Sequence, residues 1–289
     1  MNPAMACASI PSLATNMSTR VTKAQPNRVS RATFRTASHQ FQNKTRAFRG
    51  ASLSTAARRS LVTYAATAQD PLQSSQMLVI VPPHPLVKHH LTIARNKHTP
   101  SGAFRQAISE LGKILLYEMI RDWVPTVDLQ VETPCGIADA TLIDPSKPII
   151  LVPILRAGLI PIEQANIVLP VTKTYHVGYV RDEESLEASL YLNKLPEKFE
   201  DDAMIVVSDP MLATGGTMVA CLEELLKRGA KATNIRVLCI VACPVALSKL
   251  STGFPGIRVY SAMIDAELND KGYIVPGLGD AGDRAYDSE

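Results

Sequence analysis

The first 69 residues of the chain contain no aspartate and no glutamate. They do contain ten basic residues and 17 serines and threonines. A leader that is rich in serine and arginine and free of acids is typical of an organelle transit peptide. We therefore predict that residues 1–69 are disordered, direct the protein to the plastid stroma and are then cleaved, with the mitochondrion as the alternative. A basic arm for nucleic acid is the second interpretation of this composition.

The rest of the chain lacks the basic excess of its leader. From Asp70 onward 27 acidic residues stand against 20 basic ones, so the overall net charge of +3 averages two unlike parts. An acidic body argues against general binding to nucleic acid, whose phosphates attract lysine and arginine. No apolar run approaches the roughly 18 residues of a membrane-spanning helix. We expect no nucleic-acid partner and no membrane association.

Metal and redox signatures are also missing. None of the five cysteines lies in a C-x-x-C pair, and no histidine is close enough to complete a zinc site. Cys221, Cys239 and Cys243 lie in apolar stretches, so we expect reduced core residues and no disulfide framework. No G-x-x-x-x-G-K-[ST] sequence occurs, which excludes an ATP P-loop and a fused kinase half.

What the body does contain is an alternation of β-rich and helical segments. Runs such as MIVV and VLCIVA are apolar throughout, as expected for strands buried on both faces of a sheet. The pattern predicts one α/β domain over residues 70–289, with a mainly parallel central sheet flanked by helices. Residues 70–100 and the charged segment from about 181 to 199 are expected to be irregular. We expect strands at 149–153, 176–180, 204–208, 236–242 and 258–264, and helices from a Ser101 cap to about 122, from about 157, at 217–228 and near 245–250.

The most informative stretch is MIVVSDPMLATGGT, in which a buried strand ends at Asp209 and a helix is expected from Thr217. Ligands of open α/β sheets bind beyond the carboxyl ends of the strands. The exposed N–H groups and the positive dipole end of a helix N-terminus suit a phosphate. A carboxylate at Asp209 could accept hydrogen bonds from vicinal hydroxyls. The stretch therefore predicts a ribose 5-phosphate site, with an ordinary strand-to-helix turn as the alternative.

Two arginines are expected at the same edge of the sheet. Arg156 lies just past one predicted strand, and Arg181 ends the next one. Guanidinium groups form bidentate contacts with phosphates. Two solvated surface charges are the alternative, but together with the loop at Asp209 the arginines suggest a ligand with a phosphate at each end.

The stretch GLGDAG, residues 277–282, matches the dinucleotide fingerprint G-x-G-x-x-G. The fingerprint has physical meaning only where it opens a helix that leads on to a second strand. The seven residues that follow Gly282 are too few and too polar for both. We therefore expect no dinucleotide site there.

These segments resemble a known family. DPMLATGGT (209–217) resembles the phosphoribosyl-diphosphate (PRPP) loop of type I phosphoribosyltransferases. The full set looks like uracil phosphoribosyltransferase over nearly all of residues 77–289, and it comprises HPLVKH (84–89), PILRAG (153–158), YVRDEE (179–184), the PRPP loop and YIVPGLGDAGDR (273–284). Many members of the wider superfamily have two adjacent carboxylates where this chain has Asp209–Pro210. The single carboxylate is itself the pattern of the uracil enzymes.

The resemblance implies a role for each matched segment. Residues 265–289 would form a base-binding hood, in which glycines let the backbone approach a flat ring. Uracil would be read at Ile274, Gly279, Asp280 and Ala281. The implied catalytic residues are Arg156, Arg181, Asp209 and Asp280. The implied PRPP ligands are these four with Pro210, Met211, Leu212, Ala213, Thr214, Gly215, Gly216 and Thr217.

The implied reaction is uracil plus PRPP to UMP plus diphosphate, in pyrimidine salvage. The implied cofactor is Mg²⁺, held through PRPP and by no direct protein ligand. A homodimer or homotetramer is expected, and the sequence leaves open whether GTP is an effector. The alternative function is a PRPP- or nucleotide-sensing regulator on the same fold.

Overall fold

The computed structural model describes residues 77–181 and 188–288, so the predicted leader lies outside it. Within the described residues, a nine-stranded sheet has the order β1-β11-β10-β8-β4-β6-β7, with β5 beside β4 and β9 beside β10. All neighbouring strands are parallel except β6 and β7. The predicted mainly parallel sheet is confirmed. The strands are β1 (Leu78–Ile80), β4 (Ile149–Leu155), β5 (Thr172–Thr174), β6 (Val177–Arg181), β7 (Ala188–Asn193), β8 (Ile205–Ser208), β9 (Met211–Leu212), β10 (Ile235–Ala242) and β11 (Arg258–Ile264).

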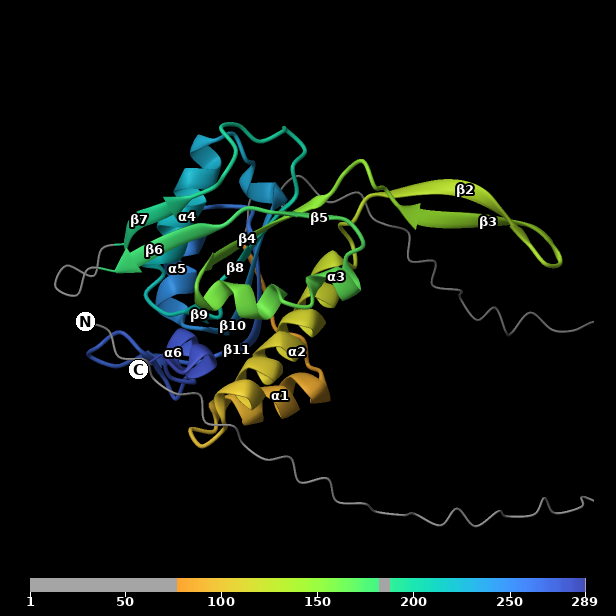
Figure 1. Ribbon diagram of the computed structural model, residues 1–289. Coiled ribbons are helices and arrows are strands. Elements are labelled where there is room, and N and C mark those ends of the chain that lie inside the picture. The colour runs from red at the N-terminus through yellow and green to blue at the C-terminus, as the bar shows by residue number, and fades with distance from the viewer. Residues whose placement is uncertain (1–76, 182–187, 289) are drawn as a thin grey trace, which may run out of the picture. The chain divides into compact units, whose positions relative to one another are not determined.

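Helices cover both faces of this sheet (Figure 1). One face carries α1 (Pro85–Arg95), α2 (Ser101–Ile120) and α3 (Ala165–Val168), and the other carries α4 (Gly216–Lys227) and α5 (Pro244–Gly253). The central strands show why two layers are needed. In β8, Val206 packs with the α1–α2 side, whereas Ile205 and Val207 pack with the α4–α5 side. Successive side chains point to opposite faces, so an unbroken apolar run requires cover on both.

The remaining elements lie around this core. Residues 157–162 and 232–234 form short 3₁₀ helices, and α6 (Ala281–Tyr286) lies near the C-terminus. Two small antiparallel pairs are formed by β2 (Thr126–Thr133) with β3 (Gly136–Ile143) and by β12 (Glu267–Leu268) with β13 (Ile274–Val275). No helix of the described residues is long and apolar enough to cross a membrane. Cys221, Cys239 and Cys243 are buried free thiols, as predicted.

The expectation of an irregular segment at residues 70–100 was wrong for part of its length, because α1 occupies Pro85–Arg95. His84 caps this helix, and its Nδ1 accepts a hydrogen bond from the Leu86 amide at 3.1 Å. Proline at the first helical position is compatible with a helix, since its missing N–H would have no intrahelical acceptor. The start of α2 also differs from expectation, because the cap position is Pro100 and Ser101 is already helical.

Two β elements were also not expected. The segment after residue 181 was predicted to be a loop, but β7 pairs antiparallel with β6 from Ala188. The pair β2–β3 extends away from the sheet (Figure 1), and neither strand contains a buried residue. Sequence reasoning relied on buried apolar runs, and this pair has none. The strands are held together by pairing with each other along their length.

Candidate active site

The predicted PRPP loop and the predicted hood meet in one cavity of about 720 Å³ at the carboxyl edge of the sheet. Asp209, Pro210, Met211 and Ala213 line it from the loop that follows β8. The hood contributes all four predicted uracil-reading residues, Ile274, Gly279, Asp280 and Ala281. The structure thus brings together two segments about sixty residues apart in the sequence, at the edge where ligands of parallel sheets bind.

Residues 209–217 are called the phosphate loop below. The first half of this loop is fixed by backbone hydrogen bonds to β10. The short strand β9 runs parallel to the end of β10, with Met211 beside Val241. The carbonyl of Pro210 accepts from the amides of Ile240 at 2.9 Å and Val241 at 3.1 Å. The amide of Asp209 donates to the carbonyl of Leu238 at 3.1 Å. The loop therefore begins as an extension of the sheet.

The second half of the phosphate loop leads into α4, which begins at Gly216, one residue before the predicted start. Gly215 caps the helix in the left-handed region, with φ of 79°. A Cβ on Gly215 would lie 3.2 Å from Ala246 in α5, so both the backbone angle and the close packing favour glycine. Leu212 is buried, and Thr214 and Thr217 are half-buried at the helix N-terminus. The phosphate loop therefore ends in the N-terminus of α4, as a phosphate-binding site requires.

Asp209 lies half-buried at the edge of the cavity. Its Oδ1 accepts from the Met211 amide at 3.4 Å, which orients the carboxylate relative to the loop. Burial raises the pKa of the Cys221 and Cys239 thiols, and the charge of Asp209 adds to that effect in both. These thiols stay protonated at neutral pH, so neither is an activated nucleophile.

Gly158 allows the segment after β4 to approach the end of β8. A Cβ on Gly158 would lie 2.2 Å from the carbonyl oxygen of Ser208, too close for any side chain. The 3₁₀ helix at residues 157–162 can therefore lie beside the loop, and Ala157 lines the cavity. The glycine of the PILRAG segment thus has a structural role in forming the site.

The two predicted arginines follow neighbouring parallel strands. Arg156 comes directly after β4, and Arg181 is the last residue of β6. The Arg156 side chain is exposed and does not line the cavity. Its Nη2 lies 3.5 Å from Oδ1 of Asp283, and its guanidinium lies 5.9 Å from the ring centre of Tyr286, both in α6. Arg156 therefore lies between the sheet edge and the hood.

GLGDAG leads into a helix, because α6 starts at Ala281. The helix has only six residues and no strand of the described chain follows it. Its N-terminus is capped by Asp280, whose Oδ1 accepts from the amides of Gly282 at 2.8 Å and Asp283 at 3.0 Å. A carboxylate thus binds the amides that a dinucleotide pyrophosphate would need, which again argues against a dinucleotide site.

Several cavity residues were not singled out from the sequence, namely Ala157, Lys271, Gly272, Tyr273 and Gly282. Lys271 and Gly272 belong to an N-D-K-G turn between β12 and β13, a turn signal directly before the hood motif. A Cβ on Gly272 would lie 3.6 Å from the methyl carbon of Thr214, so this turn touches the phosphate loop. The turn signal could have identified the turn, but not its closeness to the phosphate loop.

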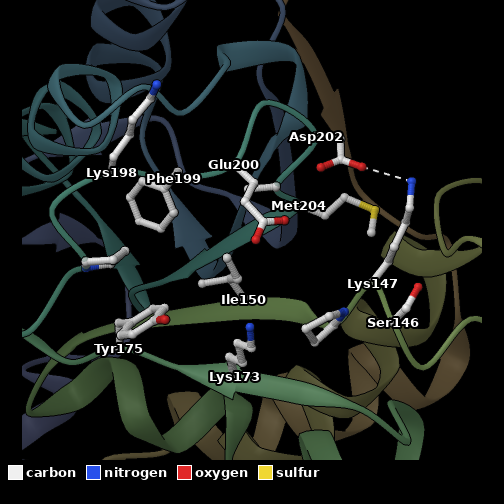
Figure 2. Close-up of a pocket in the computed structure, with 13 residues that line it drawn as sticks. Ser146, Lys147, Ile150, Lys173, Tyr175, Lys198, Phe199, Glu200, Asp202 and Met204 are labelled. Carbon is white, nitrogen blue, oxygen red and sulfur yellow. Dashed lines mark hydrogen bonds and ion pairs between the residues drawn. The ribbon is translucent and has the colours of Figure 1, made fainter.

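A second cavity, of about 230 Å³, lies where β4, β5 and β8 begin (Figure 2). Its lining includes Lys147 and Asp202, whose Nζ and Oδ2 atoms form an ion pair at 2.8 Å. None of the predicted site residues lines this cavity. It occupies the amino edge of the sheet, opposite the edge at which the loops meet.

Comparisons with known proteins identify the family. The family model described as uracil phosphoribosyltransferase matches residues 81–288. A Nicotiana tabacum uracil phosphoribosyltransferase is 51% identical over 215 residues, which are 74% of this chain and 96% of the relative. An Arabidopsis thaliana protein named uracil phosphoribosyltransferase, chloroplastic, is 50% identical over 243 residues, covering 83% of this chain and 82% of the relative.

A solved structure shares the fold of this chain. The AQ2163 protein from Aquifex aeolicus is 37% identical, superposes with a TM-score of 0.67, and covers 73% of this chain and 99% of its own. The likeness shows that a solved structure shares the fold of this chain over most of its length. On the model match and the identity to these relatives, the chain belongs to the uracil phosphoribosyltransferase family.

Proposed function

We propose that this chain transfers the phosphoribosyl group of PRPP to uracil, giving UMP and diphosphate in pyrimidine salvage. The observation that carries the proposal is the single cavity lined by both the phosphate loop and the hood. The strand-end carboxylate of Asp209 lines one side of this cavity, and the N-terminus of α4, which suits a ribose phosphate, follows in the same loop. Backbone at glycines on the other side suits a flat base.

The PRPP half of the site has three parts. The N–H groups of Gly215, Gly216 and Thr217 at the start of α4 bind the 5-phosphate. The remaining residues of the phosphate loop surround the phosphate and the ribose. Asp209 accepts hydrogen bonds from the ribose hydroxyls. Arg156 and Arg181, at the ends of neighbouring strands, neutralise the diphosphate. Asp280 lies where the base and PRPP meet, in the same cavity as Asp209.

Uracil is recognised by main-chain groups of the hood. Its edge presents O2, N3–H and O4, an acceptor–donor–acceptor row that backbone at Ile274, Gly279 and Ala281 can match. Cytosine would present an amine in place of O4 and leave buried groups mismatched. Such a mismatch can exclude an analogue by a factor of about 10⁴.

The residues present fit a magnesium ion that is held mainly by the substrate. Among the described residues, no group of three His, Cys, Asp or Glu side chains could hold a metal ion by itself. Mg²⁺ in phosphate-transferring sites commonly keeps several waters, with one or two carboxylates and substrate phosphates as ligands. Asp209 and Asp280 line the cavity, but they are assigned to the ribose hydroxyls and to the junction of base and PRPP, so the ion would be held through PRPP. When bound, the ion supplies charge neutralisation at the diphosphate.

The chemistry that these residues support is displacement at ribose C1 through an oxocarbenium-like transition state. The phosphate loop fixes the 5-phosphate end of PRPP, the arginines stabilise the charge that develops on the departing diphosphate, and the hood orients N1 of uracil toward ribose C1. The C1–N1 bond forms as the C1–O bond to diphosphate breaks, and the N1 proton is released to water or to the diphosphate. Catalysis then rests on positioning and electrostatics and needs no covalent nucleophile. The protonated, buried thiols are consistent with that mechanism.

An assay of the purified protein with PRPP and a panel of bases tests the proposal. We expect UMP from uracil and no product from cytosine. Binding of PRPP or nucleotides without turnover of any base would instead favour the sensing regulator. The prediction of a possible GTP effector can be tested in the same assay, by adding GTP at subsaturating PRPP.

We also propose that residues 1–69 direct the protein to the plastid stroma. The acid-free composition supports this, and the Arabidopsis thaliana relative carries the word chloroplastic in its name. A fluorescent reporter fused to residues 1–69 should enter plastids in plant cells. Reporter in the cytosol or nucleus would contradict the proposal, and reporter in mitochondria would favour the alternative organelle.

The homodimer or homotetramer remains a proposal for the assembly. Exposed apolar side chains on the extended pair β2–β3 support it, among them Ile137, which is 75% exposed, and Leu142, which is 57% exposed. Apolar groups at such positions favour contact with another protein surface. Sedimentation of the purified protein gives the assembly state directly.

A further inference from the structure

The glycine loop, Gly277–Asp280, needs support from outside itself. Gly277 and Gly279 have φ of 54° and 78°, in the left-handed region. Glycine loses more conformational freedom on folding than any other residue, so the loop sequence alone does not hold this shape. Two groups of side-chain hydrogen bonds connect the glycine loop to segments far away in the sequence.

The first group is centred on Asp265, which follows β11 and is 7% exposed. Its Oδ1 accepts from Nη2 of Arg95 at 2.7 Å, and its Oδ2 accepts from the Gly277 amide at 3.0 Å. Nη1 of Arg95 donates to the Gly277 carbonyl at 3.3 Å. Gly277 is therefore held at both its N–H and its C=O by one ion pair.

The Asp265–Arg95 pair is itself well fixed. The Asp265 amide donates to the carbonyl of Ala242 at the end of β10, at 2.9 Å. Arg95 is the last residue of α1, which packs against α2 through Val87, Leu91 and Ala94. The glycine loop is thus tied to the sheet and to a helix whose own position is set by the core.

The second group is centred on Arg284 of α6. Its Nη1 donates to the carbonyls of Ala94 and Leu278, both at 2.6 Å, and its Nη2 donates to the carbonyl of Asn96 at 2.7 Å. The guanidinium lies 4.2 Å from the ring centre of Phe104. One planar cation therefore joins the glycine loop to the end of α1, and its aliphatic stem lies 3.4 Å from where a Gly279 Cβ would be.

We propose that Arg95, Asp265 and Arg284 are positioning residues for the pyrimidine, acting through the glycine loop and not by touching the substrate. The proposal rests on the proposed function, because it assumes that the hood reads the base. All three bind the loop that presents Gly279 and Asp280, and none of them lines the cavity. None of their hydrogen bonds reaches the phosphate loop. We call the hydrogen bonds of these three residues with the glycine loop the clamp. Loss of the clamp should therefore raise the KM for uracil and leave the KM for PRPP nearly unchanged.

The sharpest test replaces Asp265 with asparagine. Asp265→Asn keeps the size of the side chain, but its amide cannot accept from Gly277 and Arg95 at once without turning an NH₂ toward one of these donors. We expect the KM for uracil to rise roughly 10- to 100-fold, the usual consequence of losing a charge-assisted hydrogen bond. The KM for PRPP should stay within about twofold of the wild-type value. Asp202→Asn, which removes a carboxylate paired with Lys147 at the opposite edge, is the matched control.

Two substitutions at Arg284 test the proposal independently. Arg284→Lys keeps the charge and can reach part of the carbonyl set, whereas Arg284→Ala loses every hydrogen bond. The KM for uracil should follow the order wild type, lysine, alanine. Arg121→Ala removes an exposed arginine that pairs only with Glu118 among the described residues and should change neither KM. Equal rises in both KM values, or a fall in melting temperature with unchanged uracil kinetics, would overturn the proposal.

Hydrogen exchange of the substrate-free protein separates this proposal from the proposed function. Asp265→Asn and Arg284→Ala should speed exchange of the amides at residues 277–279 at least tenfold, while amides of the phosphate loop stay unchanged. Wild-type protection in both variants would show that the clamp does not hold the loop. If wild-type protein fails to use uracil but the exchange changes as expected, then the proposed function is wrong, the clamp on the loop stands, and its assignment to the pyrimidine falls.

Discussion

The phosphate loop and the hood line the same cavity but are held in place in different ways. The phosphate loop is fixed by backbone hydrogen bonds to β10, the strand beside it in the sheet, and by its continuation into α4. The glycine loop of the hood is fixed by side chains, and Arg95 and Arg284 join it to a helix more than 180 residues away in sequence. The first region is fixed by its own strand–loop–helix unit and by the neighbouring strand β10. The second depends on the whole domain being folded.

This difference predicts different sensitivities to substitution. Backbone pairing in the phosphate loop tolerates most changes of side chain, so its weak points are the residues that touch ligand and the glycines with unusual φ. The hood should be sensitive both at its glycines and at distant residues that hold it. Substitutions in the two regions should also separate kinetically, with uracil parameters responding to the hood and PRPP parameters to the loop.

The largest effect is expected at Gly277. A Cβ there would lie 2.1 Å from the carbonyl oxygen of Ile274, and backbone atoms cannot move apart cheaply. Gly277→Ala should lower kcat/KM for uracil by at least about 150-fold, equivalent to about 3 kcal/mol of strain or displaced structure. Calorimetric titration with PRPP should show binding within a few-fold of wild type.

Gly272→Ala is the matched control for this experiment. Gly272 also has a left-handed φ, of 78°, but its Cβ would meet only a methyl carbon of Thr214, at 3.6 Å. We expect less than about a 30-fold loss, since an alanine in that region usually costs about 1–2 kcal/mol. Equal losses in the two variants would show that backbone angle alone, and not the contact with Ile274, limits the hood.

The two regions also differ in how far the sequence predicts them. Continuous apolar runs predicted the central strands, and the loop at Asp209 was predicted because strand, loop and helix are contiguous. The clamp gave no such signal, since Asp265 and Arg95 meet only in the folded domain. Arg284 lies within the GLGDAGDR stretch but has the appearance of an ordinary surface charge. The pair β2–β3 was missed for a different reason, because its half-exposed strands bury no residue completely.

An effect of intermediate size is expected at Asp209. Asp209→Ala removes the carboxylate that we assign to the ribose hydroxyls, so the KM for PRPP should rise and kcat should fall. The combined loss should be about 10- to 150-fold, as for one charge-assisted hydrogen bond. Asp201→Ala, at an exposed residue before β8, is the control. Unchanged PRPP kinetics in a folded Asp209→Ala protein would remove Asp209 from the site.

The smallest effect, and the finest comparison, is within the phosphate loop between two adjacent glycines. Gly215 has φ of 79° and packs 3.2 Å from Ala246, whereas Gly216 is the first residue of α4 and a Cβ there would meet only Oγ1 of Thr214, at 3.9 Å. Gly215→Ala should cost about 1–2 kcal/mol, seen as a roughly 5- to 30-fold rise in the KM for PRPP or a matching loss of stability. Gly216→Ala should leave the KM for PRPP within about threefold and raise the melting temperature slightly, since alanine favours a helix.

In neither variant should the KM for uracil change by more than about threefold. If Gly215→Ala raised the KM for uracil as strongly as that for PRPP, the phosphate loop and the hood would be one coupled unit, and the distinction between backbone-held and side-chain-held regions would fail.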